Sequence, residues 1–302
     1  MSVTDRCNQS CFFCHKEGCV EEGTLLSIDD FLFVCKTVHD LGFVKFKLTG
    51  GEPTLRSDIC QLVEKLASLN LPDLSMISNG TTLETLAPAL RSAGLKRLNI
   101  TLNTLNEKKH KKINIGKYAP LESIVRGVDA AIDAGFKDIK LNFVHLGKDS
   151  DADMEDVLDF ATQRGLTMVL LPIMPNNTDE SAANLRNLRM KLEQLGINSV
   201  KKDVDLEGIN RLFITMKSGA KILLRQDELG ERVPYTFCAN CHDKKRCKEG
   251  IFPLRVSAHG TLLPCLASKH NRIEMRPAIE ARDKQSLVAG VEQIWRWQTG
   301  WK

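Results

Sequence analysis

The sequence of 302 residues has few aromatic residues, little net charge and no long apolar run. Aromatic residues make up 6% of it, and 42 basic residues compare with 38 acidic ones, which leaves a formal net charge of +4. Without a strong positive charge or a basic-aromatic stripe, nucleic acid is not an expected partner. No apolar run approaches the roughly 18 residues that cross a bilayer, and no secretory signal is visible, so we expect a cytoplasmic protein without a membrane partner.

The rest of the composition is that of a globular protein, because 42% of the residues are apolar and 26% are charged. Strand patterns alternate with helix patterns, which indicates βαβ units and a mainly parallel sheet in an α/β barrel or partial barrel. The expected strands are Phe43–Leu48, Leu74–Ser78, Arg97–Leu102, Ile139–Val144 and Thr167–Ile173. The expected helices are one that begins at Ile28 and then Asp58–Leu69, Leu83–Ala93, Leu121–Ala134, Met154–Gln163 and Ala182–Leu195.

The pattern changes near residue 200. A hairpin is expected over Arg211–Thr215 and Lys221–Leu224, then a second strand pair across His259-Gly260, and a last helix over Leu287–Trp297. We therefore expect a barrel domain over residues 1–200 and a C-terminal region over residues 201–302. The basic run Lys108–Lys112 is typical of a solvated surface, with a phosphate site as the less common alternative.

Ten cysteines are many for a chain of this kind, and they gather towards its two ends. In a reducing cytosol, clustered thiols are typical of metal ligands or redox groups rather than of disulfides. Cys35 lies on the apolar stripe of the helix from Ile28, and Cys60 lies in a predicted helix without metal-type spacing. These two are expected to pack in the core.

Cys7, Cys11 and Cys14 place three thiols in eight residues, directly after Ser2–Asp5, a plausible first strand. Three such thiols suit an iron–sulfur cluster with one iron left open. Structural zinc is the alternative, with Cys19 or His15 as fourth ligand. Parallel barrels carry their chemistry at the carboxyl ends of the strands, which is where this loop falls.

The string Gly50-Gly51-Glu52-Pro53 follows the second expected strand. Two glycines allow a backbone to approach a ligand closely, and the adjacent carboxylate can accept a hydrogen bond from an ammonium group. A plain turn between a strand and a helix explains the glycines but not the whole string.

Together, Cys7-x3-Cys11-x2-Cys14 and Gly50-Gly51-Glu52-Pro53 resemble the radical S-adenosylmethionine (SAM) superfamily, and within it the GTP 3′,8-cyclase family of molybdenum-cofactor biosynthesis. The resemblance implies a partial (βα)6 barrel in which the three thiols hold a [4Fe–4S] cluster. SAM would bind the open iron, and its reductive cleavage would yield a radical that abstracts hydrogen from a small-molecule substrate. An electron donor such as a flavodoxin or ferredoxin is implied as a partner.

The same resemblance assigns residues to SAM. Gly50, Gly51 and Glu52 would hold its amino group, and Met174 would lie at its adenine. Its ribose and carboxylate would be lined by Ser78, Asn79, Thr101 and Asn103, the last two standing where the family usually has Ser and Asp. The candidates for substrate contact are Arg6, Lys140 and Arg255.

A second group of thiols comprises Cys238, Cys241, Cys247 and Cys265. Its spacing suits zinc or an iron–sulfur cluster, and the resemblance favours a second, auxiliary [4Fe–4S] cluster in a C-terminal cysteine-rich extension. Cys247 lies in an insertion relative to the family. It is either a fourth ligand, which would close the open iron, or a thiol that returns a hydrogen atom to the substrate.

The chain departs from the cyclases where nucleotides would be recognised. Pro253 stands where the family has an arginine, and Thr167–Ile173 lacks another. Because guanidinium groups suit triphosphates, these losses favour a divergent nucleotide or sugar-like substrate. The alternatives are GTP 3′,8-cyclase activity itself, a radical SAM epimerase or peptide-modifying enzyme, and a non-enzymatic iron–sulfur or zinc protein. The intact Gly50–Pro53 string argues against the last.

Overall fold

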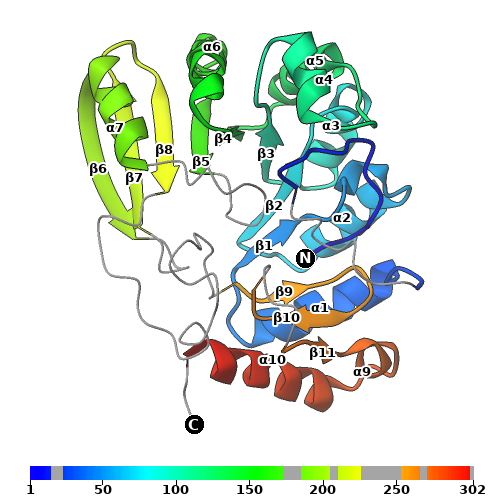
Figure 1. The fold of residues 1–302 in the computed structure, drawn as a ribbon. Helices are drawn as coiled ribbons and strands as arrows, with labels where there is room; N and C mark the ends of the chain where they lie inside the picture. The colour runs from blue at the N-terminus through cyan, green and yellow to red at the C-terminus, as the bar shows by residue number, and fades with distance from the viewer. Residues whose placement is uncertain (15–22, 173–184, 205–209, 226–252, 266–270, 300–302) are drawn as a thin grey trace.

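The computed structural model describes residues 1–14, 23–172, 185–204, 210–225, 253–265 and 271–299 (Figure 1). Its centre is an eight-stranded sheet whose strands lie in the order β1-β2-β3-β4-β5-β8-β7-β6. The strands are β1 (Lys45–Leu48), β2 (Asp73–Ser78), β3 (Arg97–Thr101), β4 (Asp138–His145), β5 (Thr167–Pro172), β6 (Ile197–Val204), β7 (Asn210–Met216) and β8 (Lys221–Arg225).

Strands β1 to β5 pair in parallel in chain order, and β8 continues this parallel set beside β5. β7 and β6 extend the sheet with antiparallel pairings. The mainly parallel α/β sheet and the hairpin of β7 and β8 are thus confirmed. The boundary expected at residue 200 falls inside β6, in the same sheet as β1 to β5, and the division into two domains stays a prediction.

One helix precedes β1, and others connect the strands that follow. They are α1 (Ile28–Asp40), α2 (Ile59–Ala67), α3 (Leu83–Ser92), α4 (Glu107–Ile113), α5 (Leu121–Asp133), α6 (Asp151–Gln163) and α7 (Leu185–Gln194), with short 3-10 helices η1 (Pro53–Leu55) and η2 (Lys148–Ser150). Helix α1 begins as expected, because the Ser27 and Asp30 side chains each bind the other's backbone N–H. None of the helices in the described part of the chain has the length and apolar character needed to cross a membrane.

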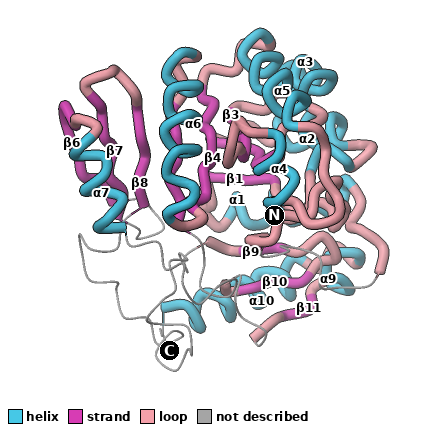
Figure 2. The backbone as a smooth tube through the Cα atoms, turned by 45° about the horizontal axis from the view of Figure 1, so that its top comes forward, coloured by secondary structure: helices cyan, strands magenta, loops and turns pink. Residues whose placement is uncertain are grey.

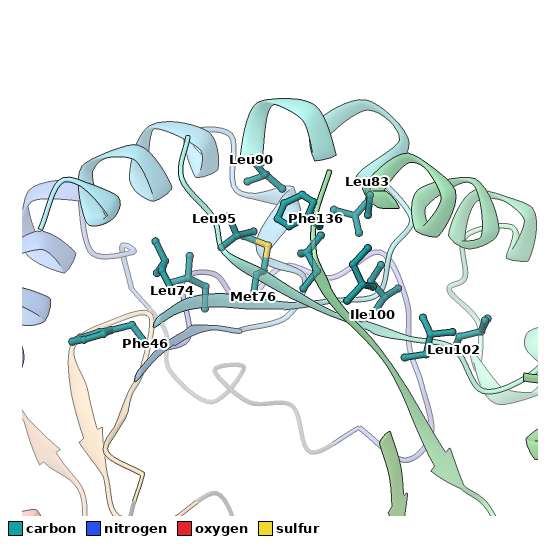
Figure 3. Close-up of a cluster of buried hydrophobic side chains, with 14 of the residues drawn as sticks. Phe46, Leu74, Met76, Leu83, Leu90, Leu95, Ile100, Leu102 and Phe136 are labelled. Carbon is teal, nitrogen blue, oxygen red and sulfur yellow. The ribbon is translucent and has the colours of Figure 1, made fainter. Parts of the chain in front are cut away.

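The two faces of the parallel sheet differ in character, because successive residues of a strand point to opposite faces. One face packs against the helices through buried apolar side chains such as Leu74, Met76 and Ile100 (Figure 3). The opposite face is mixed: polar side chains at Lys47, Ser75, Asn99, Lys140 and Thr167 alternate with apolar ones such as Ile77 and Val169. The sheet therefore has one apolar face, which forms the core, and one face that carries polar groups.

The C-terminal region forms a small antiparallel sheet of β9 (Arg255–Val256), β10 (Thr261–Leu263) and β11 (Ile273–Glu274), followed by α9 (Arg276–Glu280) and α10 (Lys284–Thr299). Figure 2 shows this group beneath β1 and α1. Two backbone hydrogen bonds attach it to the N-terminal part, from Ser2 N–H to Val256 O and from Leu26 N–H to Ala258 O, at 2.9 and 2.8 Å. The strand pair across His259-Gly260 is confirmed.

Two expectations near the termini are corrected. Ser2–Asp5 makes one parallel bridge, between Ser2 and Thr49, and forms no strand. The regular ladder ends there because Gly50 adopts a φ of +144° and Gly51 N–H turns to the Thr4 carbonyl. The last helix begins at Lys284, three residues before the expected start, with Asp283 accepting a hydrogen bond from Ser286 N–H.

Candidate cluster and cofactor site

The candidate residues for SAM gather at the carboxyl ends of three neighbouring strands. Gly50, Gly51 and Glu52 follow β1, Ser78 ends β2 and Thr101 ends β3. Residues 7–14, which we call the cysteine loop, lie at the same edge of the sheet, because Ser2 bridges Thr49 directly after β1. In parallel sheets this edge carries the functional groups.

The two glycines seat the chain that leads into the cysteine loop. A Cβ atom on Gly50 would lie 2.3 Å from Thr4 O, and one on Gly51 would lie 2.3 Å from Arg6 O. The backbones bind at this close approach, from Gly51 N–H to Thr4 O at 2.8 Å and from Glu52 N–H to Arg6 O at 2.7 Å. The close approach that the glycines allow is therefore made by this chain's own backbone, just before Cys7.

Glu52 is a buried carboxylate that joins the ends of β1 and β2. It is 1% exposed, and its Oε1 accepts hydrogen bonds from the Thr54 and Ser78 hydroxyls at 2.6 and 2.8 Å. Its Oε2 accepts the Asn79 N–H at 2.6 Å. Burial raises the pKa of Glu52, and these hydrogen bonds act in the opposite direction. Among the described residues Oε2 has one such partner, which leaves it acceptor capacity for an ammonium group.

A network of amides connects this carboxylate to the first thiol. The Asn79 side-chain amide donates to Asn8 Oδ1 at 2.8 Å and lies 3.9 Å from Cys7 Sγ. The Gln9 N–H also points at Cys7 Sγ, at 3.4 Å. Hydrogen bonds of this kind to a cysteine sulfur stabilise a thiolate and tune an iron–sulfur cluster.

The three thiols of the loop lie close enough to affect one another. Burial, together with the neighbouring Cys14 and Cys7, raises the pKa of Cys11 to about 12; burial also raises the pKa of Cys7. Cys7 and Cys11 are half-buried, whereas Cys14 is exposed. Bound metal removes such protons, since the thiolate is the ligand.

The three thiols of the loop suit an iron–sulfur cluster. Within the described residues, no three His, Cys, Asp or Glu side chains converge on one metal position. A four-iron cluster takes its thiolates on separate irons, so its ligands do not need to meet at one point. Thiolates are the ligands of iron–sulfur clusters, and zinc binds them as well.

The cysteine loop rests on the segment that follows α4, which sequence reasoning missed. Cys11 pairs with Asn114, and the Cys11 thiol donates to Asn114 Oδ1 at 3.0 Å. Backbone hydrogen bonds run from Phe12 N–H to Ile113 O and from Ser10 N–H to Lys117 O, at 3.0 and 2.9 Å. Asn106, the N-cap residue of α4, could have indicated the start of this helix. The helix was not predicted because its lysine-rich sequence lacks an apolar pattern.

The remaining described candidates lie in different places. Asn103 Oδ1 accepts the Val144 N–H at 2.8 Å and so fixes the ends of β3 and β4. Arg6 is exposed beside Cys7, and Arg255 is half-buried at the start of β9. Lys140 is paired with Asn99, two residues before Thr101, and its ammonium lies 3.0 Å from Asp138. The structure therefore places Lys140 nearer the amino ends of the strands than the cysteine loop.

Several predicted site residues lie outside the described residues, namely Met174, Cys238, Cys241 and Cys247, together with the zinc alternatives His15 and Cys19. Of the second thiol group the structure describes Cys265, which is buried after β10. Cys35 is fully buried in the core, as expected, and Cys60 packs against the core while partly exposed.

Sequence reasoning also missed a contact between the C-terminal sheet and the cysteine loop. His259 is 7% exposed, and its Nε2 lies 2.5 Å from Asp5 Oδ2. Its other ring nitrogen, Nδ1, lies 3.1 Å from Thr24 O. The sequence places His259 in a turn, and nothing local indicates that it is buried.

Three relatives of this chain carry the name of one enzyme. The probable GTP 3′,8-cyclase of Methanothermobacter marburgensis is 31% identical, over 95% of this chain and 90% of the relative. The GTP 3′,8-cyclase of Saccharophagus degradans is 30% identical, over 93% and 82%. The probable GTP 3′,8-cyclase of Sulfurisphaera tokodaii is 32% identical, over 97% and 88%.

A solved structure shares the fold. SuiB of Streptococcus suis, bound to S-adenosylmethionine, superimposes with a TM-score of 0.62 at 15% identity, over 95% of this chain and 62% of SuiB. This chain thus spans less than two thirds of SuiB. Residues 1–161 match the sequence pattern of the radical SAM superfamily, which is more than half of the chain. Together with the cyclase relatives, this match shows that the chain belongs to the radical SAM superfamily and is a GTP 3′,8-cyclase-like radical SAM enzyme.

Proposed function

We propose that this enzyme uses SAM and a [4Fe–4S] cluster on Cys7, Cys11 and Cys14 to abstract hydrogen from a small polar substrate of nucleotide or sugar-like chemistry. The observation that carries the proposal is the hydrogen-bonded path from Glu52 through Asn79 to Cys7. It links the candidate SAM residues to the first cluster ligand at one edge of the sheet. When bound, the cluster and SAM supply a one-electron cleavage that starts the reaction.

This chain's residues would position and protect these groups. Gln9 N–H and the Asn79 amide stabilise the Cys7 thiolate. Glu52 fixes the ends of β1 and β2, and its Oε2 receives the amino group of SAM. Ser78, Asn79, Thr101 and Asn103 would border the ribose and carboxylate of SAM, and Met174 would lie at its adenine.

The second thiol group would hold an auxiliary [4Fe–4S] cluster beside the first site. Support comes from the contacts between His259 and Asp5 and between Val256 and Ser2, which hold the sheet carrying Cys265 against the cysteine loop. Cys238, Cys241 and Cys247 would complete the set. Zinc is the alternative, and it is distinguished by an iron and zinc count after anaerobic reconstitution.

The proposal has two versions, which differ in the substrate: a molecule other than GTP, or GTP itself. Pro253 in place of a family arginine favours a substrate other than GTP, with Arg255 and Arg6 as the remaining cations for it. The specific observation for GTP itself is the name of the relatives, which are about 30% identical over nearly the full chain.

The test is a substrate comparison under anaerobic conditions. The reconstituted enzyme is given SAM, dithionite and one candidate at a time: GTP, other nucleoside triphosphates, or nucleotide sugars. Release of 5′-deoxyadenosine and loss of the candidate are followed by mass spectrometry. Consumption of GTP establishes the cyclase-like substrate; consumption of another candidate establishes divergence. No 5′-deoxyadenosine with any candidate contradicts the proposed function.

A further inference from the structure

The lysines of α4 and the loop after it form an exposed basic surface next to the cysteine loop. We infer that this surface is the docking site for a small acidic one-electron carrier protein that reduces the cluster. We call it the α4 face and define it by Lys108, Lys111, Lys112 and Lys117 with the apolar side chains of Phe12 and Ile115. The inference rests on the proposed function and names the partner of its first step.

The α4 face is continuous with the loop that carries the cluster ligands. Ile115 N–H binds Ser10 O at 2.9 Å, and the Lys117 ammonium donates to the Cys7 carbonyl. The Cys11 thiol touches Asn114 within the same segment. Figure 1 shows the dark blue N-terminal segment beside the loop that follows α4. A protein that binds this face therefore lies directly against the ligands of the cluster.

The charge of the α4 face is positive and is not neutralised locally. Residues 107–118 contain five lysines and one acid, Glu107. Lys109 is committed to Asp153 at 2.7 Å, and His110 is buried. The other four lysines form no ion pair with a carboxylate among the described residues. Lys111 lies over the Tyr118 ring, at 5.2 Å from its centroid, and its hydrogen bond with Tyr118 raises the pKa of Lys111.

Apolar exposure distinguishes this face from an ordinary solvated helix. Ile115 is 68% exposed, more than any other large apolar side chain among the described residues, and Phe12 on the cysteine loop is 36% exposed. A few exposed apolar groups within a charged rim are typical of a protein interface. Complementary charge speeds encounter, and small interfaces permit the rapid release that electron-transfer partners need. A negatively charged carrier, such as a flavodoxin or an acidic ferredoxin, fits this combination.

The redox step is balanced. Each encounter oxidises the carrier by one electron and reduces the cluster by one electron. No bond forms or breaks in the protein, and no proton or leaving group needs to cross the interface. The carrier is therefore the co-reactant that the proposed function requires, and it dissociates after each transfer.

The experiment compares two reductants of the same reconstituted enzyme. Dithionite is a small molecule that needs no docking site, whereas flavodoxin, kept reduced by its reductase and NADPH, must bind. The test variant is Lys108→Glu/Lys111→Glu/Lys112→Glu. The matched control is Lys201→Glu/Lys202→Glu, two exposed lysines on β6 at the other end of the sheet. Circular dichroism and melting temperature check that both variants fold.

In the test variant, we expect the flavodoxin-driven release of 5′-deoxyadenosine to fall about tenfold or more through a higher KM for flavodoxin, since like charges then oppose docking. The dithionite-driven rate stays at the wild-type value, and the control keeps both rates. Added salt slows the flavodoxin reaction of the wild type and has little effect on that of the test variant. A second variant, Ile115→Ser, raises the KM without changing the salt dependence.

Three results would overturn the inference. An unchanged flavodoxin reaction in the test variant places the carrier elsewhere. An equal fall with both reductants shows that the lysines act on the fold or on SAM. Calorimetric titration of the holoenzyme with flavodoxin gives a readout that does not depend on turnover, and equal affinity of wild type and test variant also contradicts the inference. Failure of the proposed function is distinct, because wild type then releases no 5′-deoxyadenosine even with dithionite.

Discussion

His259 Nε2 and Asp5 Oδ2 lie 2.5 Å apart, although 254 positions separate the two residues in the chain. His259 belongs to the turn between β9 and β10, and Asp5 lies two residues before Cys7. The pair therefore connects the C-terminal sheet to the start of the cysteine loop. We expect the C-terminal region to help position the first cluster as well as to carry its own thiols.

Replacement of His259 tests this connection. His259→Ala removes the contact that His259 makes with the Asp5 carboxylate and is expected to cost about 1–3 kcal/mol of stability and to lower the iron bound per chain. The matched control is His39→Ala. His39 lies on α1, and its ring contacts the backbone carbonyl of Phe43 rather than the cysteine loop. This control is expected to cost stability without loss of iron. Equal iron contents in the two variants would refute the positioning role; thermal unfolding and iron analysis are the measurements.

Gly51 tests the close approach of the two backbones. Gly51→Ala puts a Cβ atom 2.3 Å from Arg6 O, so the cysteine loop has to move and iron incorporation is expected to fall severalfold. Gly135→Ala is the control, because its φ of +81° strains an alanine but no atom lies within 4 Å of the new Cβ. This control is expected to lose about 1 kcal/mol of stability and no iron. The prediction fails if Gly51→Ala reconstitutes like wild type.

Glu52→Gln tests the buried carboxylate. In the wild type, hydrogen-bond donors bind both oxygens of the Glu52 carboxylate, whereas a glutamine side chain has a single acceptor oxygen. We therefore expect a loss of about 1–3 kcal/mol in the free energy of unfolding. Because burial raises the pKa of Glu52 above the usual 4.5, the folded state of the wild type binds the proton more tightly than the unfolded state. Wild-type stability therefore decreases as pH rises from 4.5 through the raised pKa.

Glu52→Gln has no carboxyl group to titrate at this position. The difference in free energy of unfolding between wild type and variant should therefore become smaller as pH rises through that window. Urea unfolding at a series of pH values measures it, with Glu64→Gln on the exposed face of α2 as control. A deficit that widens with pH would show that the folded-state pKa of Glu52 is lowered instead.

Cys265 tests the second thiol group. If Cys238, Cys241, Cys247 and Cys265 hold an auxiliary [4Fe–4S] cluster, Cys265→Ser should reduce the iron content from about eight to about four per chain. Cys60→Ser, which changes a thiol of α2 that packs against the core, should leave about eight. Zinc in the wild type at one equivalent, with about four irons, would contradict the auxiliary cluster and assign the group a structural role.

The sequence predicted the parallel sheet well because its strands and helices each have a strong apolar pattern, which supplies buried side chains such as Leu74 and Met76 of β2 and Leu90 of α3 (Figure 3). It missed α4, whose Lys-rich sequence has no apolar stripe and is held by Asn106 and the buried His110. It also missed β6, an edge strand with exposed Lys201 and Lys202, because half-polar edge strands lack the pattern of buried ones.

Motifs identified the cysteine loop and the Gly50–Glu52 string, because both are contiguous in sequence. Motifs did not reveal that the glycines face the backbone of Thr4 and Arg6, or that Asp5 meets His259, since such contacts depend on the tertiary fold. Lys140 was chosen from the sequence because it is a cation on an expected strand. In the structure it pairs with Asn99 and its ammonium contacts Asp138, so it lies away from the cysteine loop.

Electron paramagnetic resonance of the dithionite-reduced, reconstituted protein, before and after addition of SAM, tests whether the three thiols of the cysteine loop hold a cluster that binds SAM. We expect a reduced [4Fe–4S] signal that changes when SAM is added. In the variant Cys7→Ala/Cys11→Ala/Cys14→Ala, this SAM-sensitive signal and the release of 5′-deoxyadenosine should both be lost. A wild-type signal that does not respond to SAM, or a SAM response that survives in the triple variant, would contradict this expectation.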